Sequence, residues 1–192
     1  IFLNIFFNKI FVFFCLITLL NGLNFIDGLN GLSSGYLLLI NLIFCFFINS
    51  NFILNENILN LNLILIKIYL VFFLFNIFGK CFFGDNGIYV SLVCNSLIFI
   101  NFFQLNYHLI SPYLIASLLW YPAFENLFSI LRRFKKRKKI IEPDNLHLHY
   151  LLMNYLKNNK FLKSKNKIFY NSISGVLVNL ILFPGYIYSI FY

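Results

Sequence analysis

Six stretches of this sequence are each apolar over roughly the length that a helix needs to cross a lipid bilayer, which is about 20 residues. Only 11% of the residues are charged and 60% are hydrophobic, whereas soluble domains carry about 25% charged residues. A soluble chain of 192 residues has too small an interior to bury so much Phe, Ile and Leu. We therefore predict an all-α, polytopic transmembrane helical bundle with about six spans, at 4–20, 32–49, 58–78, 87–105, 109–131 and 168–191.

The basic residues are confined to alternate connections between these spans. Lys9 and Lys67 lie inside spans, and every other Lys and Arg lies in the first, third or fifth connection. Basic loops stay on the cytoplasmic side of a membrane, so we expect these three connections to face the cytoplasm. The first, third and fifth connections are 21–31, 79–86 and 132–167, and the second and fourth are 50–57 and 106–108.

The formal net charge of +9 is therefore a property of loops beside a membrane. The run RRFKKRKK at 132–139 resembles a nucleic-acid-binding patch. Its juxtamembrane position explains the charge as that of a positive-inside loop that can rest on anionic lipid headgroups, and we expect no nucleic-acid partner. The cysteines lack metal-site spacing and lie in or beside apolar runs, which favours small buried side chains over disulfides or zinc ligands. We predict one membrane domain over 1–192, with 132–167 as its basic cytoplasmic loop.

The first and third connections each contain an aspartate beside glycines. In NGLNFIDGLNG, Asn24 and Asp27 are three residues apart and would share one helix face. In FFGDNG, Asp85 precedes an apolar run. Each aspartate by itself is typical of a helix cap or a turn. The alternative function is a Mg²⁺ site, because Mg²⁺ binds one or two carboxylates together with substrate phosphates.

Two further polar features lie near the fifth connection. His147 and His149 are two residues apart and would lie on the same side of an extended segment. With no third ligand nearby, pairing with a phosphate is favoured over a metal site. Glu125 lies within a span, where an acidic residue is a functional candidate by default. It could equally form an ion pair with Lys67 or with a nearby basic residue, and the sequence leaves both open.

The order, spacing and shared side of these motifs resemble the polyprenyl-phosphate N-acetylhexosamine-1-phosphate transferases, the glycosyltransferase family 4 enzymes. Their loop N-x-x-N-x-x-D-G-x-D-G-L is matched by residues 21–32, from Asn21 to Leu32, and their G-D-x-G by residues 84–87. Their later motifs P-x-x-[DE], R-R and P-D-x-x-H-x-H-H are matched by Pro122, Glu125, Arg132, Arg133, Pro143, Asp144, His147 and His149. The resemblance covers about residues 21–152.

The resemblance implies transfer of a phospho-N-acetylhexosamine, GlcNAc-1-phosphate above all, from a UDP-sugar to a polyprenyl phosphate such as undecaprenyl phosphate, with release of UMP. It places the enzyme in the bacterial inner membrane, in cell-wall or lipopolysaccharide synthesis, with Mg²⁺, or Mn²⁺ in its place, as cofactor. It assigns catalytic roles to Asp27, Asp85 and His147, of which Asp85 and Asp27 are the metal ligands. It assigns substrate binding to Asn21, Asn24, Asn30, Arg132, Arg133 and His149.

The chain departs from the family pattern at three places. Asn30 stands where the family has its second aspartate, Tyr150 replaces the last histidine, and the adjacent aspartate pair of an earlier family loop is absent. We therefore expect the chain to be the C-terminal portion of a longer enzyme. The alternatives are a truncated, inactive homologue and a non-enzymatic membrane transport component. The sequence leaves the sugar, the lipid length and the oligomeric state open, a homodimer included.

Overall fold

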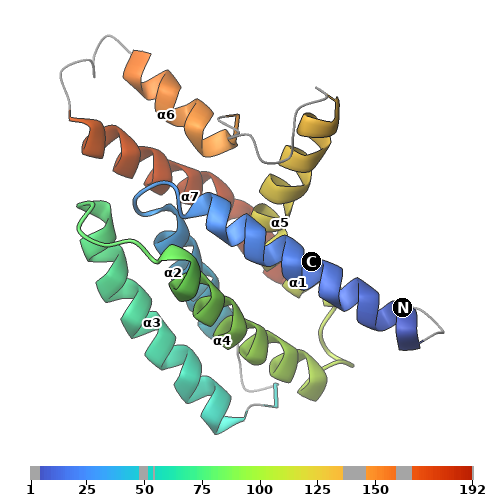
Figure 1. The fold of residues 1–192 in the computed structure, drawn as a ribbon. Helices are drawn as coiled ribbons and strands as arrows, with labels where there is room; N and C mark the ends of the chain where they lie inside the picture. The colour runs from blue at the N-terminus through green and yellow to red at the C-terminus, as the bar shows by residue number, and fades with distance from the viewer. Residues whose placement is uncertain (1–4, 48–51, 54, 136–145, 159–165, 192) are drawn as a thin grey trace.

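The structure is a computed structural model, and it describes residues 5–47, 52–53, 55–135, 146–158 and 166–191. All regular structure in these residues is helical, as predicted, and the helices form one bundle (Figure 1). The helices are α1 (Ile5–Ile26), α2 (Leu32–Phe47), α3 (Glu56–Ile77), α4 (Gly84–Leu105), α5 (Pro112–Lys135), α6 (Leu148–Asn158) and α7 (Lys167–Phe191).

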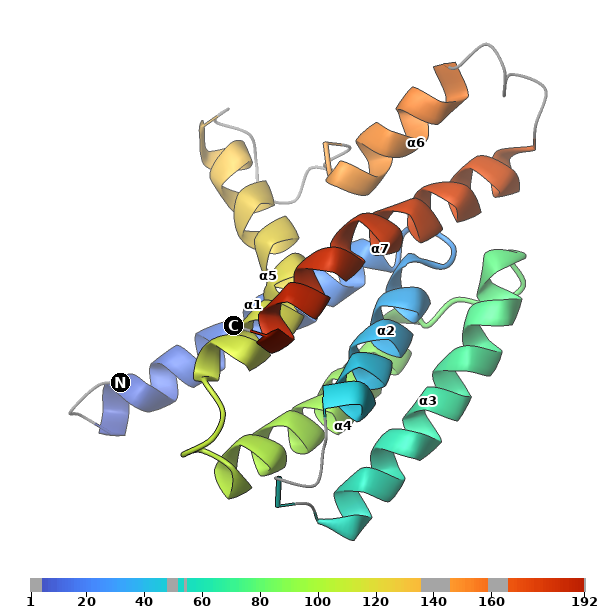
Figure 2. The same cartoon turned by 180° about the vertical axis from the view of Figure 1, so that it is seen from behind.

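Each predicted span coincides with a helix, but the helices are not equal in length. Five of them, α1, α3, α4, α5 and α7, are long and apolar enough to cross a membrane. The second predicted span, 32–49, is shorter than expected, because α2 has only 16 residues in the described part of the chain. Tyr36, Leu37 and Ile40 are almost completely buried, because α2 packs between α3 and α7 in the middle of the bundle (Figure 2).

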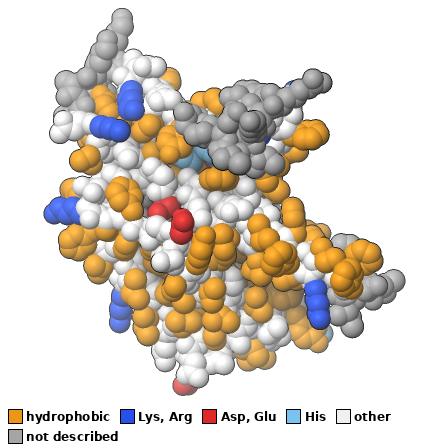
Figure 3. Space-filling view, in the orientation of Figure 1, with side chains coloured by type: hydrophobic (Ala, Val, Ile, Leu, Met, Phe, Trp, Pro, Cys, Tyr) orange, Lys and Arg blue, Asp and Glu red, His pale blue; other side chains and the backbone are white. Residues whose placement is uncertain are grey.

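Many apolar side chains are exposed along the long helices, and Figure 3 shows them spread over one face of the bundle. This is the arrangement expected where lipid is the solvent, because exposed apolar surface on this scale is rare in soluble monomers. The lipid-facing positions come from every long helix, and examples are Phe13, Val71, Val90, Leu131 and Ile181.

Asparagines join the helices inside the bundle. The Asn41 Nδ2 on α2 donates to the Asn95 Oδ1 on α4 at 2.7 Å, and the Asn95 Nδ2 donates to the Tyr69 Oη on α3 at 2.9 Å. The side chain of Asn62 donates to the backbone oxygen of Asn41. Lipid offers no hydrogen bonds, so polar side chains that pair across helices stabilise a membrane bundle.

Glycines allow two close contacts that position the loops. A Cβ at Gly22 would lie 2.0 Å from the backbone oxygen of Pro122, so α1 approaches α5 closely at the proline inside that helix. A Cβ at Gly175 would lie 2.3 Å from the backbone oxygen of Asn30, so α7 rests directly on the α1–α2 loop. Any larger side chain would separate these elements.

The connections gather at the two ends of the bundle as their alternation predicts. At one end the backbone N–H of Gly84 donates to Asp27, joining the first and third connections. At the other end the Asn106 side chain bonds the backbone of Ile53, joining the second and fourth connections. We call the first of these the motif end. Its orientation towards the cytoplasm stays a prediction.

Candidate active site

Asp27 lies at the motif end, in the loop where α1 stops and α2 begins. Its two carboxylate oxygens have different partners: Oδ1 accepts a hydrogen bond from the Ser33 hydroxyl at 2.5 Å, and Oδ2 accepts one from the backbone N–H of Gly84 at 3.1 Å. The loop closes through Gly31, whose φ of 76° is a conformation that glycine adopts without strain. The carboxylate is thereby held in one orientation, half-buried.

Asp85 lies beside this carboxylate, exposed in the first turn of α4. Burial raises the pKa of Asp27, hydrogen bonds from Ser33 and Gly84 lower it, and the negative charge of Asp85 raises it again. The two predicted metal ligands are therefore close enough to repel each other. Gly84 and Asp27 are 57 residues apart in the sequence, and the hydrogen bond between them brings the start of α4 to the α1–α2 loop.

The donor set at this point fits a divalent cation. Mg²⁺ takes one or two protein carboxylates and completes its shell with water and substrate phosphate oxygens. Asp27 and Asp85 supply two, and a cation would cancel the repulsion that raises the pKa of Asp27. In the described part of the chain, no group of three or more His, Cys, Asp or Glu side chains gathers as an all-protein metal cage. The site therefore suits a cation shared with a phosphate substrate.

Asn76 at the end of α3 ties the two motif loops together. Its Oδ1 accepts hydrogen bonds from the backbone N–H of Gly31 at 2.5 Å and from the Ser34 hydroxyl at 3.0 Å. Its Nδ2 donates to the backbone oxygen of Cys81 at 2.6 Å. One buried side chain thus binds the loop of Asp27 and the loop that leads to Asp85. Asn76 is not among the site residues predicted from the sequence, because nothing in its local pattern distinguishes it from the other asparagines.

Asn30 is oriented differently from Asp27. It is 2% exposed, its Nδ2 donates to the Ser172 hydroxyl on α7, and its backbone N–H donates to the Asn171 side chain. Its side chain fixes the loop to α7. The proposed substrate contact of Asn30 stays a prediction.

Replacing Asn30 with aspartate tests this placement. We expect Asn30→Asp to lower the melting temperature, because a carboxylate would be buried against Ser172 at a cost of a few kcal/mol. Asn21→Asp is the matched control, because Asn21 is exposed, and its melting temperature should stay unchanged. A stable Asn30→Asp protein with faster turnover would instead return this position to the substrate site.

His147 connects the segment before α6 to α5. Its Nδ1 is 2.8 Å from the Oε2 of Glu125, and the other carboxylate oxygen of Glu125 accepts the backbone N–H of Leu148 at 3.2 Å. Glu125 is 3% exposed. The sequence left the partner of Glu125 open, and the structure identifies it as His147 and the N-terminus of α6. Glu125 is therefore a positioning residue for the predicted catalytic histidine.

His149 is completely buried. Its ring stacks on that of His147, with centroids 5.3 Å apart, and neither ring nitrogen has a hydrogen-bond partner in the described structure. Burial lowers the pKa of His149 to about 4, against the opposing attraction of Glu125. The ring is consequently neutral at pH 7. A direct contact of either histidine with a phosphate stays a prediction, since both are buried in this state.

The burial of His149 predicts loss of stability in acid. Its pKa falls from 6.5 to about 4 on folding, so the unfolded chain takes up the proton first as the pH drops. Stability from this residue is complete above pH 6.5 and falls by roughly 3 kcal/mol towards pH 4. Melting curves across this range should show a smaller loss for His149→Phe. The control is His108→Phe at an exposed position, and equal losses in both variants would contradict the prediction.

The remaining predicted site residues lie on α1, on α5 or outside the described part of the chain. Asn21 and Asn24 are in the last turns of α1, and the Oδ1 of Asn24 is buried without a hydrogen-bond partner in the described structure. Arg132 lies over the Phe128 ring of its own helix. Figures 1 and 2 show the end of α5, which carries Arg132 and Arg133, standing apart from the α1–α2 loop. Pro143 and Asp144 fall outside the described residues.

Comparison with known proteins decides the family. A family model described as glycosyl transferase family 4 matches residues 1–102, more than half of the chain, and this region contains both Asp27 and Asp85. The chain belongs to glycosyl transferase family 4. The resemblance found in the motifs is thus confirmed, and the two carboxylates of the motif end lie inside the part that matches.

A curated relative narrows the comparison. The chain is similar to a probable undecaprenyl-phosphate N-acetylglucosaminyl 1-phosphate transferase of Bacillus subtilis (strain 168), with 30% identity over 136 residues. The match covers 69% of this chain and 37% of the relative, so the chain spans well under half of the length of that protein. No solved structure matches the chain significantly.

Proposed function

We propose that this family 4 chain forms part of an enzyme that transfers phospho-N-acetylhexosamine, GlcNAc-1-phosphate first among the candidates, from a UDP-sugar to a polyprenyl phosphate. The observation that carries the proposal is the junction of Asp27, Gly84 and Asp85 at one end of an apolar bundle. A carboxylate pair at the end of a membrane bundle can serve a reaction between a lipid phosphate and a soluble nucleotide.

The proposed reaction makes one bond to phosphorus and breaks another. An oxygen of the lipid phosphate attacks the β-phosphorus of the UDP-sugar, and the bond from that phosphorus to the oxygen bridging to the α-phosphate breaks, which releases UMP. The second pKa of a phosphate monoester is near 6, so the nucleophile is already mostly deprotonated at neutral pH. The barrier is largely electrostatic, because nucleophile and leaving group are both anionic.

The residues of the motif end meet this requirement by positioning. Ser33 and Gly84 hold the Asp27 carboxylate, and the α4 helix presents Asp85. Asp27 and Asp85 would hold Mg²⁺, or Mn²⁺ in its place. When bound, the cation supplies positive charge to the phosphate oxygens and orients them. Glu125 holds His147 in a fixed orientation, and this ring is the proposed catalytic histidine.

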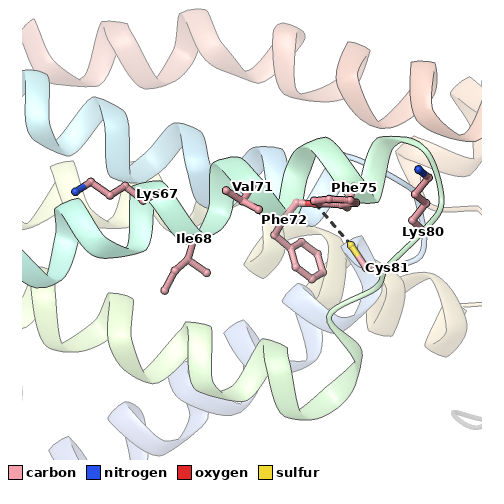
Figure 4. A pocket seen from close by; sticks show the side chains of 7 residues that line it. All are labelled: Lys67, Ile68, Val71, Phe72, Phe75, Lys80 and Cys81. Atoms are coloured by element: carbon pink, nitrogen blue, oxygen red, sulfur yellow. Dashed lines mark hydrogen bonds between the residues drawn. The ribbon is translucent and has the colours of Figure 1, made fainter.

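A groove on the outer surface fits a prenyl chain. It has a volume of about 600 Å³ and runs along α3 towards the loop before α4 (Figure 4). Its floor is mostly apolar, and a lysine lies at each end, with Lys80 at the end near the motif loops. Cys81 lies in the same groove. Burial raises the pKa of its thiol, and the negative charge of the nearby Asp27 raises it further. The lining residues are Lys67, Ile68, Val71, Phe72, Phe75, Lys80 and Cys81.

This function implies a setting for the protein. The acceptor lipid requires a membrane, the soluble donor requires the cytoplasmic side, and the product would serve cell-envelope polysaccharide synthesis in the bacterial inner membrane. The positive loops at the motif end support that orientation. The donor sugar, the lipid and the pathway all belong to the proposal.

Replacement of Asp85 tests the proposed function directly. In the intact enzyme, Asp85→Asn should abolish Mg²⁺-dependent release of UMP from UDP-GlcNAc in the presence of undecaprenyl phosphate, because one of two cation ligands loses its charge. Glu56→Gln is the matched control, since Glu56 is an exposed acid in the first turn of α3 and should leave the rate unchanged. Full activity of Asp85→Asn would remove this residue from the site.

A further inference from the structure

A cavity of about 420 Å³ lies between α6, the beginning of α7 and the α1–α2 loop. This volume falls within the range of small-molecule sites. Figure 1 shows α6 beside the first turns of α7, with which it packs. Among the described residues, none that lines the cavity is acidic or comes from α4, so it is a different site from the one that Asp27 and Asp85 form. The lining residues are Gly28, Leu29, Tyr150, Met153, Asn154, Lys157, Lys167 and Asn171.

Both helices contribute a lysine and an asparagine to this cavity. On α6, Asn154 and Lys157 are three residues apart, and on α7, Lys167 and Asn171 are four residues apart. Each pair therefore shares one face of its helix. Two ammonium groups and two amides around one volume favour an anionic ligand. Lysine is a common phosphate binder because its ammonium group is a compact charge with three donors, so a phosphate group suits this lining.

The hydrogen bonds at the cavity wall leave donors for such a ligand. The Oδ1 of Asn171 accepts the backbone N–H of Asn30 at 3.1 Å, so the Nδ2 of the same side chain is the end that can donate to a phosphate oxygen. The Tyr150 hydroxyl reaches the α1–α2 loop, because a Cβ at Gly28 would lie only 2.7 Å from it. A phosphate in the cavity would therefore bridge α6, α7 and this loop.

The position of the cavity along α7 favours a lipid over a soluble phosphate. Lys167 is the first residue of a helix that is long and apolar enough to cross a membrane, so it lies where the hydrocarbon core meets the headgroups. The next residue, Ile168, is 53% exposed, and a Cβ at Gly79 would lie 3.8 Å from its Cγ2. Phe78, which precedes Gly79, is 66% exposed. Apolar surface for acyl chains therefore begins beside the cavity.

We propose that this cavity binds the phosphate of an anionic membrane phospholipid, at a site separate from the site of the reaction. Basic pockets between spans on the cytoplasmic side of membrane proteins bind such headgroups, in agreement with the orientation that the basic loops predict. The bound headgroup would hold α6 against α7. A soluble phosphate is the other source of the same chemistry. The inference does not depend on the proposed function.

Thermal unfolding of the intact protein in nanodiscs tests the site. Nanodiscs of phosphatidylcholine and phosphatidylglycerol in equal parts should give a higher melting temperature than phosphatidylcholine alone, because a ligand bound only by the folded protein stabilises it. The increase should be lost in the double variant Lys157→Gln/Lys167→Gln. It should be kept in Lys135→Gln, which removes the same charge at an exposed position on α5.

A direct measurement of lipid retention supports the same test. In native mass spectra of the detergent-solubilised protein, each single Lys→Gln change in the cavity should weaken phosphatidylglycerol binding about fivefold, the usual effect of one lysine at an anionic lipid surface. Melting temperatures in phosphatidylcholine alone show whether the variants are folded. An equal increase with phosphatidylglycerol in the wild type and the double variant would show that the lipid acts through general surface charge, and would overturn the site.

Inorganic phosphate separates the two sources of the ligand. Added to the protein in phosphatidylcholine nanodiscs, it should leave the melting temperature unchanged. If it reproduces the increase in the wild type but not in the double variant, the cavity holds a soluble anion and the lipid assignment is overturned. Binding of UDP-GlcNAc should be unaffected in the double variant. Its loss would make the cavity part of the donor site and would overturn the proposal as well.

Discussion

Asp27→Asn is expected to abolish UMP release by the intact enzyme while making the protein more resistant to heat in EDTA. Loss of activity by about a thousandfold follows if the carboxylate helps to hold a cation that stabilises the transition state by several kcal/mol. The gain in stability has a separate cause. Burial and the charge of Asp85 both raise the pKa of Asp27, so its ionised form is costly in the folded protein.

The sign of the pH dependence follows from the same shift. The unfolded chain ionises Asp27 near its ordinary pKa of 3.8 and the folded protein only at higher pH, so the free energy of unfolding falls as the pH rises through this interval. Melting curves in EDTA at pH 7 should therefore show a higher melting temperature for Asp27→Asn than for the wild type. Addition of Mg²⁺ should raise the melting temperature of the wild type alone.

Ser33→Ala provides the contrast for this experiment. It removes a hydrogen bond that stabilises the ionised Asp27, so it should lower the melting temperature while the charge stays. A melting temperature of Asp27→Asn below that of the wild type in EDTA would show that the carboxylate stabilises the loop more than its burial costs. Retained UMP release would show that the site lies elsewhere.

Glu125→Ala is expected to loosen the start of α6. The change leaves His147 and the backbone N–H of Leu148 without the acceptor that both now share, at a cost of about 2–4 kcal/mol. Hydrogen exchange of the α6 amides should accelerate markedly, with little change in the middle of α2. Activity should fall as well, because the segment with His147 and His149 would lose its position.

Glu125→Gln separates the shape of this contact from its charge. The glutamine oxygen can still accept from Leu148, and its NH₂ group can face His147 only if the Nδ1 of that ring carries no proton. We therefore expect α6 to stay protected from exchange while kcat falls and its pH profile shifts, as befits an altered tautomer of His147. Rapid exchange of α6 in Glu125→Gln, or unchanged exchange in Glu125→Ala, would contradict the role of Glu125 as a positioning residue.

Hydropathy and charge were sufficient to predict the helical class, the position of each long helix and the grouping of the loops at two ends. These features depend on one-dimensional properties, because about 20 apolar residues must form a helix in lipid and alternate loops must share a side. The pairing of Asp27 with the loop of Asp85 was anticipated in the same way, from the shared side and the family motif.

The tertiary structure alone decided which way the polar side chains face. The Asn30 side chain bonds Ser172 on α7, and Glu125 pairs with His147. Asn76 lies between the two motif loops. Lys157 on α6 and Lys167 on α7 line one cavity. A helix that is apolar on every side has no polar stripe to reveal its orientation. The sequence therefore determines where the helices of this protein lie along the chain, and only their packing determines which residues meet at the motif end.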